Sequence, residues 1–483
     1  MDYSQFLAMK QEIGLLIVFL LVFLYDTFFS KKAQGALPVV TCVLFALLTA
    51  FGLLCPSVKD GAVAFAGMYA TSPAIVAIKN ILNVGVLIVL IQSIKWANSE
   101  FTAVRRGEFY ELILLTLLGM YFMISSGHFL IFIIGLETAS LPLAAMVAFD
   151  KNRYESHEAA IKYILTAVFS SAILLMGLSF VYGIAGTLYY DGIAMSLFGG
   201  SAMSVMLIVA LAFVIAGFGF KLSLVPFHMW TADVYQGAPT SVTSYLSVIS
   251  KGSAAFAFLV VLTQVFGTVY EQAWEWMLYA IIILTITIGN LFAMRQRNMK
   301  RFLAFSSISQ AGYIMLGVIA FDYMGISALM YYVLVYIFSN LAAFGVIGSI
   351  ENATGKIDMT DYNGLYKTNP RLAFTMMLAM FSLAGIPPFA GFFSKFFIFT
   401  SAAQQGTPEM YVLIFIALLN TIISLYYYLL VVKAMFINET DTPLPTFRSA
   451  NSERLGLWIC VAGIVFVGLV SPVYDYLLTV VLP

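Results

Sequence analysis

The chain has 483 residues, of which 61% are hydrophobic and 10% are charged, and its mean hydropathy is +0.95. Soluble domains carry about one-quarter charged residues, and one aqueous core stops growing at roughly 250–300 residues, so lipid must be the solvent for most of this chain. Basic and acidic residues balance at 24 each, which favours neither nucleic acid nor an acidic surface as a partner.

Fourteen apolar stretches approach the length of about 20 residues that a spanning helix needs. In chain order they are 11–29, 36–55, 73–95, 109–126, 127–149, 159–185, 202–222, 238–266, 274–294, 299–320, 325–350, 370–401, 408–436 and 453–481. The sequence therefore predicts an all-α polytopic membrane protein with about 14 transmembrane helices.

Basic residues gather in every second connection between these predicted helices. Sixteen of the 24 lie there, whereas the connections on the other side hold Lys10 and Lys59. Because basic loops stay in the cytoplasm, we expect a multi-pass protein of the bacterial inner membrane with both termini on the periplasmic side.

Six lysines lie inside the predicted spans, where one charge costs ~2.5–3.5 kcal/mol. They are Lys79, Lys162, Lys221, Lys251, Lys395 and Lys433. Lys79, Lys162 and Lys433 lie near helix ends, and a side chain that snorkels to the headgroups is the alternative for these three. Lys251 is near the middle of 239–266, too far from either end for that explanation.

Lys221 and Lys395 each lie beside a predicted interruption of a helix. Pro226 follows Lys221, and Pro387 precedes Lys395. Proline breaks the helical hydrogen bonds, and broken helices at membrane depth are tolerated where they face protein or a wet cavity. The alternative for these two lysines and Lys251 is a structural buried ion pair.

Glu137 stands out as a carboxylate near the centre of a predicted helix. In the membrane it needs a lysine partner or a proton, and Lys221 is the partner we predict. His228, next to the break, is placed to bridge Lys221 and Lys251, with an ordinary structural histidine as the alternative.

Hydroxyl side chains precede Lys251 on one face of its predicted helix. Ser244 and Ser247 lie seven and four residues before it, a helical spacing. Such hydroxyls can simply join helices, but beside a mid-membrane lysine we expect them to hold water.

The lysine and proline combination occurs in the seventh and the twelfth predicted helices. Because that offset is odd, the two copies cross the membrane in opposite senses, which is typical of inverted repeats in transporters. We predict an N-terminal three-helix segment (1–108), two five-helix repeats (109–266 and 267–436) and a C-terminal helix (437–483).

Five stretches carry a resemblance to a known family. They are 158–163, 219–242, 298–313, 385–396 and 426–436. With them the chain resembles the antiporter-like membrane subunits of respiratory complex I (NADH:quinone oxidoreductase), and it is most similar to the N-type. Lys395 stands where M-type members carry glutamate, and the sequence ends directly after a predicted span where L-type members continue into a long lateral helix, so we expect an N-type rather than an L-type member.

The sequence also departs from that family at four positions. Ala232 and Ser241 replace common prolines, Leu430 replaces a frequent arginine, and Gln310 stands where many members have histidine. Because glutamine does not titrate, we assign no proton transfer to the tenth predicted helix.

The resemblance implies a proton-translocating subunit in which Glu137 pairs with Lys221, Lys251 connects, Lys395 is the terminal group and Lys162 modulates. It places NAD, flavin, iron–sulfur clusters and quinone in partner subunits, and it implies the other membrane-arm subunits as partners. We expect no cofactor and no redox centre on this chain, because its three cysteines lie far apart.

The free energy of the proposed ion pair is comparable to the work of moving one proton across the membrane. An ion pair at ~4 Å contributes about 4 kcal/mol at an effective dielectric of about 20, and moving one charge against ~100 mV costs ~2.3 kcal/mol. Two other classes stay open at this point: a subunit of a Na⁺/H⁺ antiporter or membrane-bound hydrogenase-type complex, and a passive scaffold.

Overall fold

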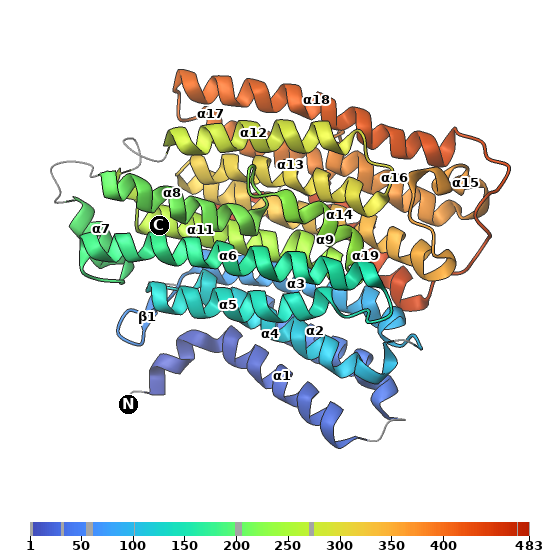
Figure 1. The fold of residues 1–483 in the computed structure, drawn as a ribbon, viewed down its shortest axis with the longest axis horizontal. Helices are drawn as coiled ribbons and strands as arrows, with labels where there is room; N and C mark the ends of the chain where they lie inside the picture. Colours follow the sequence, from blue (N-terminus) through green and yellow to red (C-terminus); the bar gives the residue numbers. More distant parts are fainter. Residues whose placement is uncertain are drawn as a thin grey trace.

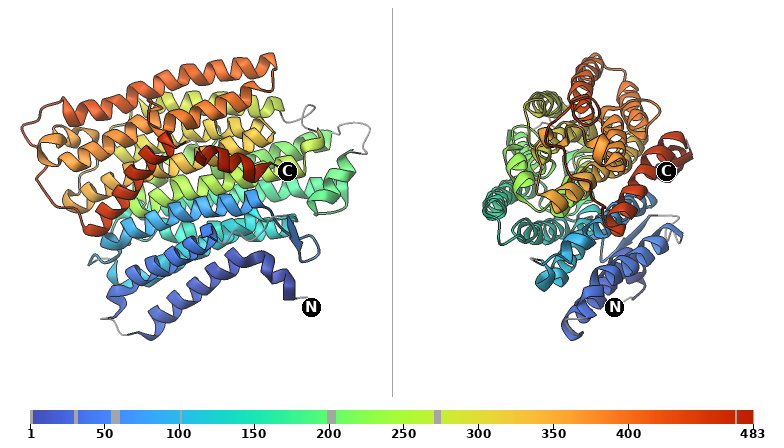
Figure 2. Two further views of the ribbon diagram at one scale, coloured as in Figure 1. Left: turned by 180° about the vertical axis from the view of Figure 1, so that it is seen from behind. Right: turned by 90° about the vertical axis from the view of Figure 1, so that its right-hand side faces the viewer.

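The structure is a computed structural model that describes residues 3–29, 33–54, 61–100, 102–198, 205–269, 275–470 and 472–482. The predictions that involve Lys31, Lys32, Cys55 and Lys59 lie outside these residues. The long helices run side by side, and the N- and C-termini point toward the same end of the bundle (Figures 1 and 2).

The long helices follow the predicted spans closely. They are α1 (Lys10–Phe28), α2 (Leu37–Leu54), α3 (Pro73–Ala97), α4 (Arg106–Ile124), α5 (Phe129–Val147), α6 (Tyr154–Ala185), α8 (Val205–Leu222), α11 (Lys251–Gln264), α12 (Glu275–Ala293), α13 (Met299–Ile319), α14 (Tyr323–Thr354), α18 (Pro408–Phe436) and α19 (Asn451–Leu469). Within the described residues, 13 helical segments are long and apolar enough to cross a membrane, which confirms the all-α polytopic fold class.

Shorter elements connect or interrupt these helices. They are η1 (Tyr3–Met9), η2 (Ala33–Ala36), η3 (Ala103–Arg105), α7 (Tyr190–Phe198), α9 (Met229–Gly237), α10 (Thr240–Tyr245), η4 (Leu246–Ser250), η5 (Gly267–Val269), η7 (Met359–Tyr362), α15 (Leu365–Thr368), α16 (Pro370–Ala384), α17 (Ala390–Ala403) and α20 (Pro472–Val481). A two-stranded antiparallel hairpin, β1 (Ala62–Ala64) with β2 (Tyr69–Thr71), is a small addition to the helical fold.

Both predicted interruptions are present. The seventh predicted helix ends as α8 at Leu222 and the short α9 follows the break, whereas the twelfth divides into α16 and α17. Each half of the twelfth predicted helix is shorter than a span, so neither half is among the 13 helical segments that qualify by length. The predicted count of 14 and the inverted relation of the two repeats stay predictions.

The last predicted span, 453–481, is not one continuous helix. The helix α19 ends at Leu469, and the separate helix α20 begins at Pro472. Proline has no N–H to donate to the preceding turn, and the residue before it is pushed out of the helical conformation. The predicted boundary was therefore wrong, although the apolar composition was read correctly.

The connections meet at two opposite ends of the bundle. At one end, which we call the basic end, Arg153 pairs with Glu351 and Lys95 pairs with Glu453. At the opposite end, β2 meets the turn between α4 and α5. The basic loops thus share one end, as the predicted orientation requires, and the helical segments α10–α11, α13 and α14 form the buried centre between the ends.

Candidate functional site

Lys221 lies in the last turn of α8, directly before the first break, and its side chain is 8% exposed. Its ammonium donates a hydrogen bond to the hydroxyl of Ser140 on α5. The Ser140 hydroxyl in turn donates to the carbonyl of Leu136 at 2.5 Å. A hydroxyl from a neighbouring helix therefore satisfies the buried charge of Lys221, as a buried ammonium requires.

Glu137 lies one turn before Ser140 on the same helix, close enough to Lys221 for an electrostatic interaction. Among the described residues, however, no carboxylate oxygen lies within 4.0 Å of the Lys221 ammonium. The predicted direct ion pair is thus not formed in this structure. Lys221 contacts the hydroxyl of Ser140 instead of the carboxylate of Glu137.

Lys251 is the first residue of α11, near the centre of the bundle, and is 1% exposed. Its ammonium donates to the Ser307 hydroxyl at 2.8 Å and to the Ser307 carbonyl at 3.3 Å. The phenol ring of Tyr235 lies 5.5 Å away, at a distance suited to a cation–π interaction. No carboxylate in the described residues pairs with this lysine, so polar neutral groups hold it.

A π-helical segment, η4, immediately precedes Lys251. Its wider turns rotate the following residues by roughly a quarter of a turn, and such segments are frequent at functional sites. Ser247, inside the segment, accepts a hydrogen bond from Asn340 of α14 at 2.9 Å, whereas Lys251 points to Ser307 of α13. The predicted single face of hydroxyls and lysine is therefore divided between two neighbouring helices.

Lys395 lies in α17 after the second break and is 5% exposed. Its ammonium reaches back to the last carbonyls of α16, donating to Ala384 at 2.9 Å and to Leu383 at 3.1 Å. The carbonyls at a helix C-terminus carry a partial negative charge, so this position stabilises a cation. Gly385 caps α16 at φ +87°, and a Cβ there would lie 3.0 Å from Lys395 Cδ.

A hydrogen-bonded chain extends from Lys395 toward Lys251. The carbonyl of Leu383, which Lys395 contacts, also accepts from Gln310 at 3.5 Å. The Gln310 amide donates to the Tyr428 hydroxyl at 3.1 Å, and Tyr428 lies 2.5 Å from the Ser306 hydroxyl. Ser306 is the neighbour of the serine that holds Lys251. Gln310 is thus part of the polar chain by position, although it cannot itself titrate.

Several buried polar atoms along this row have no hydrogen-bond partner in the described protein. They are Ser223 Oγ, His228 Nδ1, Thr231 Oγ1, Tyr235 Oη, Tyr336 Oη, Asn340 Oδ1 and Ser349 Oγ. Buried polar groups are normally satisfied, and ordered water fills the role where protein does not. Several of these residues belong to the break after Lys221 or contact Lys251 and its surroundings, and there we expect water between the charged groups.

His228 lies at the N-terminus of α9, beside Pro226, and is 7% exposed. It interacts electrostatically with Lys251, but its unpartnered Nδ1 makes no direct bond to Lys221 or Lys251. The bridging role of His228 between Lys221 and Lys251 stays a prediction, and in this structure it would require water.

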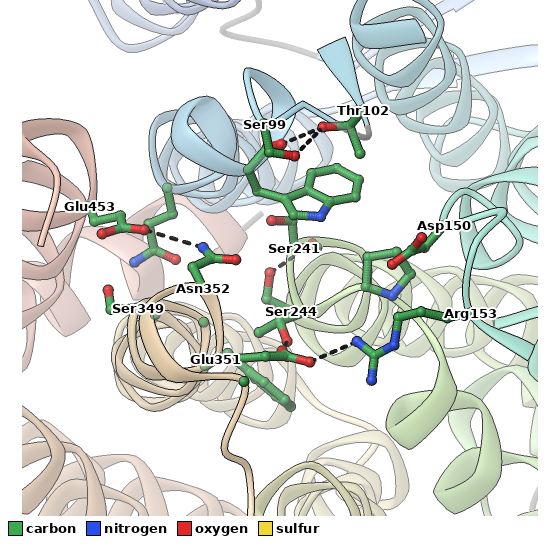
Figure 3. A pocket seen from close by; sticks show the side chains of 18 residues that line it. Ser99, Thr102, Asp150, Arg153, Ser241, Ser244, Ser349, Glu351, Asn352 and Glu453 are labelled. Atoms are coloured by element: carbon green, nitrogen blue, oxygen red, sulfur yellow. Dashed lines mark hydrogen bonds and ion pairs between the residues drawn. The ribbon is translucent and has the colours of Figure 1, made fainter. Parts of the chain in front are cut away.

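A polar pocket of about 430 Å³ lies at the basic end between α3, α10, α14 and α19. In Figure 3, Ser244 lies beside Glu351, and Arg153 reaches the Glu351 carboxylate from the right of the view. Ser244 is one turn from Ser247, the serine bonded to Asn340. The pocket therefore leads from the basic end to the hydroxyls that precede Lys251.

Glu351 is the most strongly paired carboxylate of this pocket. Lys300 lies 2.9 Å from it and Arg153 lies 3.0 Å from it, and Thr240 donates a further hydrogen bond. Lys300, which the sequence places in a basic connection, is fully buried against this carboxylate. Glu351 falls just beyond the end of a predicted span, which is why hydropathy alone did not single it out.

The three lysines near helix ends have different surroundings. Lys433 is exposed, as expected for a snorkelling side chain. Lys162 is 42% exposed and pairs with Glu158 and Asp233, each at 2.7 Å, so it is not a buried charge. Lys79 is buried, and the snorkelling alternative was wrong for it because it pairs with a buried carboxylate.

Comparison with known proteins places the chain in a family. Residues 126–424 match the family described as NADH:quinone oxidoreductase/Mrp antiporter, TM. The chain is 53% identical over 478 residues to NADH-quinone oxidoreductase subunit N of Phocaeicola vulgatus, which covers 99% of both proteins.

Solved structures give the same result for the fold. A chain of respiratory complex I from Thermus thermophilus with bound aureothin is 30% identical with a TM-score of 0.79, covering 95% of this chain and 97% of that one. A chain of the Mrp complex from Dietzia sp. DQ12-45-1b has a TM-score of 0.86 at 21% identity, covering 100% and 97%. At that identity the second likeness concerns the fold alone.

Proposed function

Because the chain belongs to the NADH:quinone oxidoreductase/Mrp antiporter transmembrane family, we propose that it is a proton-translocating membrane-arm subunit of an NADH:quinone oxidoreductase. The redox reaction takes place in partner subunits, which hold NAD, flavin, iron–sulfur clusters and quinone. The other membrane-arm subunits and the lipid bilayer are its immediate partners, in the bacterial inner membrane with both termini periplasmic.

The observation that carries this proposal is the row of Lys221, Lys251 and Lys395. All three are at least nine-tenths buried, and none has a carboxylate within ion-pair distance in the described residues. Unpaired buried charges are costly in a membrane and are a mark of ion or proton pathways. A scaffold has no use for them, because apolar residues would stabilise the same helices.

The polar groups between the lysines support a proton relay. Lys221 gives its proton to water near His228, and Lys251 receives it beside Ser307. The proton then moves through water and hydroxyl groups to Lys395, with Gln310 and Tyr428 holding the chain in place. Only O–H and N–H bonds form and break along this path.

Glu137 sets the direction of the relay. In this structure Lys221 donates a hydrogen bond to Ser140, which corresponds to the state in which Lys221 and Glu137 are separated. When the redox reaction moves Glu137 against Lys221, the electrostatic gain favours the charged lysine and loads it. When they separate, the proton leaves toward Lys251.

The polar pocket is the intake that we assign to this relay. It begins at the basic end, which is the cytoplasmic end in the predicted orientation, and reaches Ser244. Glu351, held by Lys300 and Arg153, provides a carboxylate at its wall.

A sodium–proton antiporter component is the second function considered for this sequence. The likeness to the Mrp complex is at 21% identity and concerns the fold, whereas the relative at 53% identity is named a quinone oxidoreductase subunit. The comparisons therefore favour the quinone oxidoreductase assembly.

The experiment uses the native assembly in inverted membrane vesicles supplied with NADH and quinone. Lys395→Ala should abolish proton pumping and lower coupled turnover, while the assembly still forms. Lys433→Ala, an exposed lysine on the neighbouring α18, is the matched control and should pump normally. Normal pumping by an assembled Lys395→Ala complex would refute the relay.

A further inference from the structure

Lys79 and Glu12 form an ion pair that lies apart from the row of three lysines. Lys79 Nζ is 2.5 Å from Glu12 Oε1, and the two side chains are 1% and 3% exposed. Glu12 is in the first turn of α1, and Lys79 lies about 9 Å along α3 from its start. Both helices begin at the opposite end, so the pair is buried near that end.

Tyrosine rings enclose the ammonium of Lys79. The ring centroids of Tyr69 and Tyr121 lie 5.5 Å and 5.3 Å from Nζ, and the Tyr69 hydroxyl accepts from Lys79 at 3.3 Å. Tyr69 belongs to the β hairpin, which bonds to the turn between α4 and α5 and covers the pair. These two tyrosines are the other titratable groups that face the pair.

Two acceptor atoms beside the pair are buried without a hydrogen-bond partner in the described part of the chain. They are Glu12 Oε2 and Gln11 Oε1, from successive residues of one helical turn. The amide of Gln11 is already used, since its Nε2 donates to Asn80 at 2.7 Å. Two unpartnered acceptors on successive residues call for donors that the described residues do not supply, and water fits that role.

Stability is a weak explanation for this arrangement. Moving two charges out of water costs several kcal/mol each, and replacing a buried pair by apolar residues is often neutral or stabilising. A pair built only to hold α1 against α3 would also leave no carboxylate oxygen unsatisfied.

Polar side chains lie between this cluster and the helix of Lys251. Tyr121 donates to Asn83, and Tyr245 lies near Tyr121. The Tyr245 hydroxyl lies 2.8 Å from that of Thr116, and Tyr245 directly precedes the π-helical segment before Lys251. The cluster therefore adjoins the proposed relay on the side toward the opposite end.

We propose that Glu12 is a proton-exchange group for this opposite end, with Lys79 paired to its carboxylate between turnovers. A proton arriving through water binds Oε2 and converts the carboxylate to the neutral acid. Its release to water at the opposite end restores the carboxylate and the ion pair, so one O–H bond forms and the same bond breaks. This site rests on the proposed function, because it gives the relay a second exit on the side of Lys251, in addition to release at Lys395.

The test compares protons moved per NADH oxidised in the assembled complex. A purely structural pair affects turnover and pumping together and leaves this ratio unchanged. We expect Glu12→Gln to lower it by roughly twofold or more, because losing an acid–base group slows its proton transfer by about 10²–10⁴-fold. Glu439→Gln is the control, since it removes the carboxylate of an exposed ion pair with Lys367.

A double variant separates function from packing. Glu12→Gln with Lys79→Met leaves no unpaired charge, so a structural pair would tolerate it and the ratio would equal that of Glu439→Gln. That result, or failure of both variants to assemble, overturns the proposal. A lowered ratio in the assembled double variant supports it.

The same assay distinguishes this inference from the proposed function. Normal pumping by Lys395→Ala would remove the relay itself. Loss of pumping in Lys395→Ala together with a normal ratio in the double variant would remove only the exit at Glu12.

Discussion

The two interrupted helices combine a lysine with a proline in similar ways, but their lysines are held by different chemistry. Lys221 lies before its break and donates to a side chain, the hydroxyl of Ser140. Glu137 is near Lys221 and lies on the same helix as Ser140. Lys395 stands after its break and donates to backbone carbonyls of α16. A side-chain partner can rotate away, whereas helix-end carbonyls move only with the backbone.

The difference suggests a division of labour within the proposed relay. The first break holds a lysine whose partner can be exchanged for a carboxylate, so it suits loading. The second break holds Lys395 on backbone carbonyls, with no carboxylate, so it suits release of the proton. The variants below test this contrast, beginning with the largest expected effect.

Glu137→Gln removes the carboxylate that distinguishes the first break. We expect coupled turnover to fall about tenfold or more, and a tenfold fall corresponds to an increase of only ~1.4 kcal/mol in the activation free energy. The measurement is pumping and NADH oxidation in vesicles, with the exposed Glu409→Gln as the control. Unchanged turnover would show that Glu137 does not load Lys221.

Gly385→Ala changes the backbone that holds Lys395 at the second break. The residue has φ +87°, and its new Cβ would press on the lysine side chain. We expect a lower midpoint of thermal inactivation, from a backbone cost of roughly 1–2 kcal/mol, together with weaker pumping.

The control for that variant is Gly406→Ala. Gly406 has φ +71° and open space around the added Cβ, so it carries the backbone cost without touching a lysine. Equal pumping by the two variants would mean that the position of Lys395 does not matter.

Ser140→Ala removes the hydroxyl that holds Lys221. The lost hydrogen bond to a charged group is worth about 1.5–3 kcal/mol, so we expect Lys221 to turn to Glu137 and coupled turnover to fall severalfold. Ser401→Ala, a buried serine of α17 that bonds to its own helix, is the control. If both variants behave alike, the side-chain partner of Lys221 is not a functional feature.

Ser223→Gly is expected to have the smallest effect. Ser223 adopts φ +61° at the first break, a conformation that glycine takes without strain. Relief of strain and the greater freedom of glycine nearly cancel, so we expect stability to change by about 0.5 kcal/mol or less. A clear loss of pumping would instead identify its unpartnered hydroxyl as a water site.

Much of this fold follows from sequence because the bilayer imposes simple rules. Apolar length locates the spans, and a proline beside a mid-membrane lysine locates both breaks. The division between the predicted spans 109–126 and 127–149 was also right, since α4 ends at Ile124 and His128 caps α5.

What the sequence did not reveal depends on contacts between distant residues. Glu12 lies in a mixed-charge stretch and is 67 residues from Lys79, so nothing local links them. Lys300 resembles an ordinary loop charge until Glu351 is folded against it. The replacement of Glu137 by Ser140 at Lys221 is a matter of a few ångströms between two helices, which spacing along one helix does not determine.

The π-helical segment before Lys251 has one more consequence. A regular α-helix through Leu246–Ser250 would leave Ser247 and Lys251 aimed at the same neighbour, and the intake and the lysine would share one compartment. With one residue of slack in the turn, Ser247 contacts α14 and Lys251 contacts α13. In the proposed relay a proton that enters beside Ser247 therefore changes helix face before it reaches Lys251, and this turn is where we expect leakage across the bundle to be limited.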